Sequence, residues 1–226
     1  MKGRRTGTWR GGGEEGKAGK AGKKGRRGRG DGQGRLGKGR DNGSTGRSGR
    51  ASIPVMTSPE RTDIPASWDE RTMLTTFLDY TRATVHEKCA GLSQEGASAA
   101  PLPTSPLMTV GGLVSHLYWV EQHWFEAVLL GQEIHGPWTE DDPDREMRLG
   151  AETPLAELLA RYEDQSARYR ELVATLDLDT PSKRNRGSSG EPVTLRWILF
   201  HLIEETARHN GHLDILREMA DGVTGD

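Results

Sequence analysis

The sequence contains a single cysteine, Cys89, and no long hydrophobic run. One cysteine cannot form an internal disulfide, which predicts a reducing compartment. No apolar stretch approaches the roughly 20 residues that a membrane-spanning helix needs. The basic N-terminus is not followed by the apolar segment of a secretory signal. These absences together predict a soluble, cytoplasmic protein.

Large apolar side chains are almost missing from residues 1–55, which differ sharply from the rest of the chain. This segment holds 16 lysines and arginines against 4 acidic residues, a net charge of +12, and 18 of the 30 glycines. Residues 56–226 hold 15 basic and 29 acidic residues, a net charge of −14. Because residues 1–55 can bury too little apolar surface to offset chain entropy, they are expected to form a disordered basic arm.

Three interpretations of the arm remain open. A flexible cationic segment binds RNA or DNA phosphates through charge, but the composition also fits a low-complexity tail that has no partner. The third interpretation is that the arm is not translated, because "MTSPERTDIPASWDERT" from Met56 reads as a natural start. The acidic charge of the remaining chain makes nucleic-acid binding the least favoured of these functions.

Four segments of the acidic part show the periodicity of amphipathic helices, over about 67–92, 108–131, 153–176 and 193–220. Ser67 and Glu70 have capping-box spacing, Thr109 is a cap candidate, and Thr153 with Pro154 predicts a third helix start. The first stripe contains Leu74, Phe77, Leu78, Thr81, Val85, Cys89 and Leu92. Gly-, Pro- and charge-rich connections join the segments, and no strand is expected. The predicted fold is all-α, a four-helix bundle in which the order of helix directions is left open.

The segment "HLIEETARHNGHLDILRE", residues 201–218, concentrates good metal ligands on one helix. At 100° per residue, His201, His212, Glu205 and His209 fall at about 0°, 20°, 40° and 80°. Glu205 and His209 are four residues apart, which places their Cβ atoms about 6 Å apart. On the second helix His116 and His123 lie in the apolar stripe. His116, Glu205 and His209 would make a two-histidine, one-carboxylate site with open coordination positions.

The pattern has alternative explanations without a metal. An inward histidine is more often a hydrogen-bonded core residue than a ligand, and Glu205 beside Arg208 is consistent with surface pairing. A buried carboxylate without a partner, however, costs several kcal/mol. A cation or a dense hydrogen-bond network is therefore expected around Glu205.

Three segments, "LTTFLDYTRATVHEKCAGLS", "GGLVSHLYWVEQHWFEAVLLG" and "VTLRWILFHLIEETARHNGHLDILREMADG", resemble the DinB-like superfamily. More narrowly they resemble its mini-circle protein branch from high-GC bacteria. The resemblance covers residues 66–224, which predicts one domain there, and does not reach the arm. It implies a four-helix bundle, commonly a homodimer, that holds a divalent metal, typically zinc or nickel. The implied ligands are His116 in "LVSHL" together with Glu205 and His209.

Related proteins use such a metal to activate a small thiol, mycothiol or bacillithiol, for transfer to an electrophile or for isomerisation. The resemblance therefore implies a small-molecule thiol and an electrophile as partners. On this interpretation His212 orients a ligand or shuttles a proton, and His123 and Arg208 contact substrate. Trp119, Trp124 and Trp138 are candidates for a pocket wall, although core packing is the favoured explanation for each of them. The competing function is a non-catalytic, stress-associated metal-binding bundle. Cys89 is expected to pack in the core and not to act as nucleophile.

Overall fold

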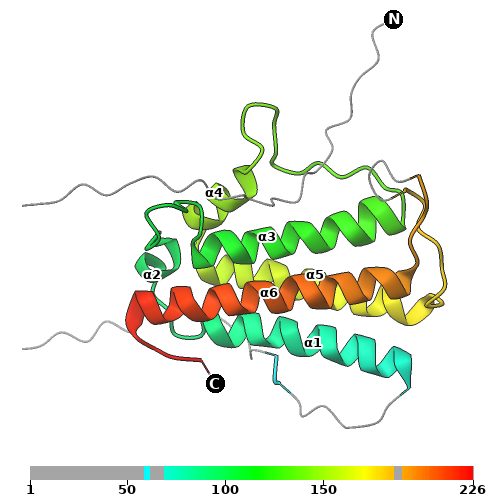
Figure 1. Ribbon diagram of the computed structural model, residues 1–226, viewed down its shortest axis with the longest axis horizontal. Coiled ribbons are helices and arrows are strands. Elements are labelled where there is room, and N and C mark those ends of the chain that lie inside the picture. The colour runs from blue at the N-terminus through cyan, green and yellow to red at the C-terminus, as the bar shows by residue number, and fades with distance from the viewer. Residues whose placement is uncertain (1–58, 62–68, 186–189, 226) are drawn as a thin grey trace, which may run out of the picture. The chain divides into compact units, whose positions relative to one another are not determined.

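The computed structural model describes residues 59–61, 69–185 and 190–225, and every regular element within them is a helix (Figure 1). The elements are α1 (Glu70–Cys89), α2 (Gln94–Ser98), α3 (Val110–Gln122), its π-helical continuation η1 (His123–Leu129), α4 (Arg145–Glu152), α5 (Leu155–Thr175) and α6 (Leu195–Asp221). An isolated bridge joins Pro181 to Thr194 in this part of the chain. The prediction of an all-α fold is confirmed, whereas the predicted arm, residues 1–55, lies outside the described residues.

The four long helical segments follow the predicted periodicity, but two short helices were not predicted. α2 and α4 lie in segments that were expected to be plain connections, because helices of five and eight residues are too short to show several turns of apolar periodicity. None of the helices in the described ranges is long and apolar enough to cross a membrane.

Helix starts depend on caps that the sequence indicated only in part. Thr109 caps α3 as predicted, because its side chain accepts a hydrogen bond from Gly112 N. The first helix begins later than expected, at Glu70, with Asp69 in place of Ser67 as its cap. For α5, the side chain of Gln94 accepts from Leu155 N at 2.8 Å, while Thr153 bonds back to the carbonyl of Leu149. The predicted Thr153 cap is therefore wrong, since a side chain from α2 performs this role.

Contacts between helices settle the directions that periodicity could not. Arg196, near the start of α6, bonds to Glu70 at the start of α1, at 2.7 Å. Lys88, near the end of α1, pairs with Asp214 in the later part of α6, at 2.8 Å. These two helices therefore run parallel. α3 and α5 are also parallel, because Tyr162 and Tyr169 of α5 bond to Glu121 and Glu126 respectively.

α3 runs opposite to α6, since it carries His116 against His209 and Trp124 against His201. The long connection between η1 and α5, which includes α4, therefore returns the chain to the end of the molecule where α3 began (Figure 1).

The interior is divided into two apolar clusters by a layer of buried polar side chains. One cluster includes Leu78, Phe125 and Ile198, and the other includes Val85, Leu113 and Leu213. Between them every long helix contributes to what we call the polar layer: Thr81, Arg82, Glu121, Gln165, Ser166, Glu205, Thr206 and Asn210. Hydrogen bonds in this layer join different helices, Arg82 to Glu121 and Asn210 to the carbonyl of Thr81, and so favour one alignment of the helices along their axes.

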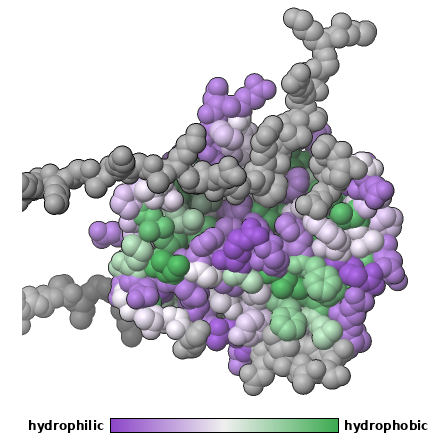
Figure 2. Space-filling model, viewed as in Figure 1, coloured by the Kyte–Doolittle hydropathy of each residue, from purple (hydrophilic) through white to green (hydrophobic). Residues whose placement is uncertain are grey.

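One residue of the predicted first stripe does not face the core. Phe77 is 40% exposed, whereas Leu74 and Leu78 beside it are buried. On α6 the exposed apolar side chains Phe200 and Ile215 lie on either side of a hydrophilic stretch that contains Glu204 and Arg208. Figure 2 shows hydrophilic side chains gathered over the middle of α6.

α4 packs against the start of α3 through two glycines. A Cβ atom at Gly150 would collide with the carbonyl of Gly111, and one at Gly111 would collide with the carbonyl of Gly150. Because backbone atoms form this contact, no side-chain rotation can make room. The two helices can approach this closely only because both positions are glycine.

Replacing Gly150 with alanine is expected to destabilise the protein by about 1–3 kcal/mol, because the backbone of α4 must move away from α3. Gly211→Ala is the matched control. Gly211 lies within α6 with no atom within 4 Å of its added Cβ, so that change should stabilise by up to about 1 kcal/mol. Urea unfolding of the full-length protein measures both changes, and equal stability of the two variants would contradict the close α3–α4 contact.

Candidate metal centre

Two helices bring three potential metal ligands together at the edge of the polar layer. His116 lies on α3, and Glu205 and His209 lie one turn apart on α6. One ligand atom from each lies within 4.8 Å of the others. The side chains are 15%, 8% and 13% exposed respectively, so the cluster is largely shielded from solvent.

Both imidazole rings direct the same nitrogen toward one carboxylate oxygen. Nε2 of His116 lies 3.5 Å from Oε1 of Glu205, and Nε2 of His209 lies 3.3 Å from the same atom. The two rings approach each other edge to face, with centroids 5.0 Å apart. The three donor atoms therefore surround one point.

The remaining ring nitrogens face other partners. Nδ1 of His209 lies 3.2 Å from Nδ1 of His212, and Nδ1 of His116 lies 3.5 Å from Oε1 of Glu146. A histidine that binds a metal through one nitrogen commonly donates the other N–H to an acceptor nearby, which fixes the ring and its tautomer. Both candidate histidines follow this pattern.

Contacts within the cluster shift the pKa values of His116 and Glu205 in opposite directions. Burial alone would lower the pKa of His116, but hydrogen bonds to Glu146 and Glu205 outweigh it and raise this pKa to about 9. Hydrogen bonds from His116 and His209 hold the pKa of Glu205 well below its usual range. Glu205 is thus an anion that needs a neighbouring positive charge, supplied either by a protonated His116 or by a metal ion that displaces this proton.

The donor set and its spacing fit a small divalent ion. Zinc binds imidazole nitrogen and carboxylate oxygen at about 2.0–2.1 Å in tetrahedral geometry, so two such ligand atoms lie about 3.3 Å apart. The two nitrogen–oxygen distances of 3.3 and 3.5 Å are close to this spacing. Three protein ligands leave a further coordination position for a substrate.

Arg208 contacts two carboxylates, those of Glu204 and Glu205. Its guanidinium donates to Oε2 of Glu205 at 3.3 Å and also bonds to Glu204. Oε1 of Glu205 is thereby left to face the two imidazoles. The predicted contact between Arg208 and substrate stays a prediction.

His212 lies beside the cluster, whereas His123 lies beyond the end of α3, at the start of η1. Desolvation and the nearby His209 and Arg208 lower the pKa of His212, which favours the neutral ring needed to accept an N–H from His209. His123 comes seven residues after His116, about 10 Å along the helix axis. There it meets Trp124 with ring centroids 5.7 Å apart, and desolvation, Arg184 and His201 lower its pKa. Its predicted role in substrate contact is not tested by this placement.

The tryptophans that were considered for a pocket wall separate into two groups. Trp124 is only 5% exposed and packs against Trp197 and His201 in the apolar interior. Trp119 lies one turn after His116 and meets Trp138 edge to face, with centroids 5.3 Å apart. Both are partly exposed, so this pair is the better candidate for a surface that a substrate touches.

Glu146 is the residue near the centre that sequence reasoning missed. It is 5% exposed and comes from α4, within the segment "GQEIHGPWTEDDPDREMRLGAE" that was expected to be a charged connection. Among so many acidic residues, nothing in the sequence distinguishes the one that is buried. Only the packing of α4 on α3 brings its carboxylate to His116.

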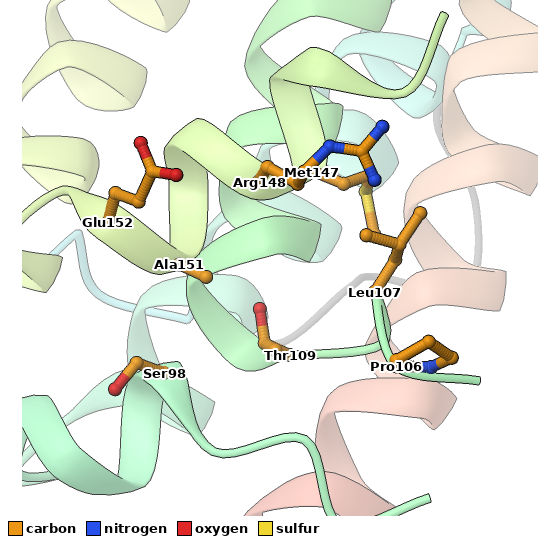
Figure 3. A pocket seen from close by; sticks show the side chains of 8 residues that line it. All are labelled: Ser98, Pro106, Leu107, Thr109, Met147, Arg148, Ala151 and Glu152. Atoms are coloured by element: carbon orange, nitrogen blue, oxygen red, sulfur yellow. The ribbon is translucent and has the colours of Figure 1, made fainter. Parts of the chain in front are cut away.

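A cavity of about 250 Å³ lies on the side of α4 that borders α2 and the start of α3 (Figure 3). It is lined by Ser98, Pro106, Leu107, Thr109, Met147, Arg148, Ala151 and Glu152. None of the three ligand candidates contributes to this lining, although Met147 and Arg148 directly follow Glu146. We therefore do not assign the cavity to the chemistry at the cluster.

Cys89 is buried in the second apolar cluster, as expected. Burial raises the pKa of its thiol to about 12, so it is not ionised at neutral pH. A buried, protonated thiol is a poor nucleophile. Any thiol chemistry at this protein must come from a thiol supplied as substrate.

A family model described as mycothiol-S-transferase matches residues 73–222, which is more than half of the chain and includes all three ligand candidates. No curated protein matches the sequence.

Proposed function

The chain belongs to the mycothiol-S-transferase family, and on this basis we propose that it binds one divalent metal ion and transfers mycothiol to an electrophile. His116, Glu205 and His209 are the proposed ligands, with zinc or nickel as the ion. The convergence of two Nε2 atoms on Oε1 of Glu205 is the observation that carries the proposal. Such a set leaves part of the coordination sphere open, which a catalytic site requires.

A divalent ion bound there stabilises a thiolate over a thiol at neutral pH. The residues of this chain hold and orient that centre. Nδ1 of His212 lies 3.2 Å from Nδ1 of His209, and we propose that it accepts the N–H there and so keeps Nε2 of His209 directed toward Glu205. Arg208 bonds the outer oxygen of Glu205 and limits rotation of the carboxylate.

The proposed reaction forms a carbon–sulfur bond between the thiol and an electrophilic carbon. The thiol releases its proton to solvent, and the leaving group departs from the carbon with the bonding electron pair. Trp119 and Trp138 form a partly exposed aromatic surface one helical turn from His116, and we propose that they contact the electrophile. The buried setting of the ligands reduces competition by water.

We also propose that residues 66–224 form one domain, in which α1, α3 with η1, α5 and α6 are the four helices of a DinB-like bundle. The family match lies within these limits. A homodimer is proposed from the superfamily resemblance. Phe77 and Phe200 supply exposed apolar surface that an interface would cover.

The function is tested with full-length protein, mycothiol and monochlorobimane, whose chloride is displaced to give a fluorescent thioether. Protein loaded with one equivalent of zinc or nickel is expected to accelerate product formation above the rate of the mixed reagents alone. Removing the metal with a chelator should return the rate to this background, and adding the ion back should restore it. Metal-loaded protein that gives only the background rate with a panel of electrophiles would contradict the transferase proposal and favour a non-catalytic metal-binding protein.

A further inference from the structure

Glu146 is a buried carboxylate with an incomplete set of contacts. Its side chain is 7% exposed, and Oε1 lies 3.5 Å from Nδ1 of His116. Within the described residues, Oε2 is shielded from solvent and has no hydrogen-bond partner. A carboxylate in this state destabilises a fold unless a favourable partner offsets its desolvation. His116 is the partner that the geometry supplies.

The position of Glu146 is set by rigid backbone contacts. Gly150, one turn after Glu146, packs against Gly111, which precedes His116 by five residues. The same glycine contact that brings α4 onto α3 therefore places the carboxylate beside the imidazole. Because neither glycine can be replaced without moving a helix, the Glu146–His116 contact is built into the way these helices pack.

We propose that Glu146 is a positioning residue that accepts the Nδ1–H of His116 and thereby directs its Nε2 toward Glu205 and the metal. This inference rests on the ligand set of the proposed function. A neutral imidazole carries one N–H, and an acceptor at Nδ1 places the hydrogen there and leaves the lone pair on Nε2. Glu146 does for His116 what His212 does for His209, but with a charged acceptor.

The alternative is that Glu146 has no effect on the metal and contributes only to the packing of α4. Glu146→Met separates the two roles, because it keeps most of the side-chain volume and removes both the acceptor and the buried charge. Because His116 keeps Glu205 as a charge partner, Glu146→Met leaves no unpaired buried charge and removes the desolvation cost of a buried carboxylate. A packing role thus predicts unchanged metal affinity in this variant.

The experiment measures Co²⁺ and Zn²⁺ affinity of full-length protein by competition with a chromophoric chelator. Glu146→Met is expected to weaken binding by about 10–100-fold, the usual effect of removing a group that orients a metal ligand. Glu146→Gln keeps an acceptor oxygen and should lose less metal affinity than Glu146→Met. Glu152→Met is the matched control on the same helix, because Glu152 is 59% exposed, and its affinity should equal that of the wild type.

Two further measurements distinguish positioning from a general defect. Melting of the metal-free proteins should show that Glu146→Met is at least as stable as the wild type. In the zinc-loaded wild type, long-range ¹H–¹⁵N spectra of the histidine rings should show His116 protonated at Nδ1. In Glu146→Met this signature should be lost or exchange-broadened.

The outcomes separate this inference from the proposed function. If Glu146→Met binds metal as tightly as the wild type does, the proposed role of Glu146 is wrong and the transferase proposal is unaffected. A large loss of affinity in Glu146→Met, in a protein that transfers no thiol, would support the positioning role and contradict the transferase proposal. A wild-type protein that binds neither ion would overturn both the ligand set and this inference.

Discussion

Glu205→Ala is expected to abolish stoichiometric metal binding and, with it, thiol transfer. Glu205 supplies the oxygen on which Nε2 of His116 and Nε2 of His209 converge, so its removal leaves two imidazoles without the anionic ligand. Losing a group that merely orients a ligand costs about 10–100-fold in affinity, and losing the ligand itself should cost more than this. Metal content of the purified protein and the bimane assay measure the two effects.

Glu204→Ala is the matched control for this variant. Glu204 is the preceding residue on α6, and its side chain is 53% exposed and bonded to Arg208. The Glu204→Ala variant should retain both the metal and the activity of the wild type, because exposed ion pairs contribute little to stability. Undiminished metal in Glu205→Ala, or equal losses in the two variants, would refute the ligand assignment.

Arg82→Ala is expected to destabilise the protein by about 3–5 kcal/mol, because it leaves Glu121 as a buried, unpaired charge. Arg82 and Glu121 form a bidentate pair at 2.9 and 2.6 Å, with side chains 2% and 0% exposed. Burial opposes the charge of Arg82, but Glu121 outweighs this effect and raises the pKa of Arg82. Tyr162 also donates to Glu121, at 3.0 Å.

Urea unfolding of two further variants shows whether the stability loss in Arg82→Ala comes from the unpaired buried charge. Arg161→Ala removes an arginine from an exposed pair with Glu157, 60% and 48% exposed, and should cost less than about 1 kcal/mol. The double variant Arg82→Leu, Glu121→Leu removes both charges and should recover most of the loss, because no unpaired charge remains. Similar costs for Arg82→Ala and Arg161→Ala would show that the Arg82–Glu121 pair is not buried in solution.

Most of the long helices were predictable because helix formation is encoded locally. The apolar stripes and the Thr109 cap correctly located α3, and the spacing of four residues correctly placed Glu205 and His209 on one face of α6. The predictions failed where a distant residue intervenes. Gln94 of α2 caps α5 in place of Thr153, and Phe77 at the edge of its stripe faces outward.

His116, the third ligand candidate, and Glu146, which lies beside it, were harder to predict from the sequence. His116 was proposed from its place in the apolar stripe of the second helix and supported by the family resemblance, since periodicity alone could not show that α3 faces α6. Glu146 was not selected at all, because α4 is short and its segment contains many acidic residues. Its role depends on the Gly111–Gly150 contact, which is a pairing of two backbones and has no local signature.

The sequence by itself determined an all-helical acidic part, one buried thiol, and two potential ligands one turn apart on the last helix. These features follow from side-chain periodicity and composition, which act over a few residues. Only the tertiary structure decided that α1 and α6 run parallel and oppose α3, that Arg82 neutralises Glu121, and that Glu146 reaches His116. These outcomes depend on long connections and on contacts between residues far apart in the chain, where small differences in packing select one arrangement of the helices.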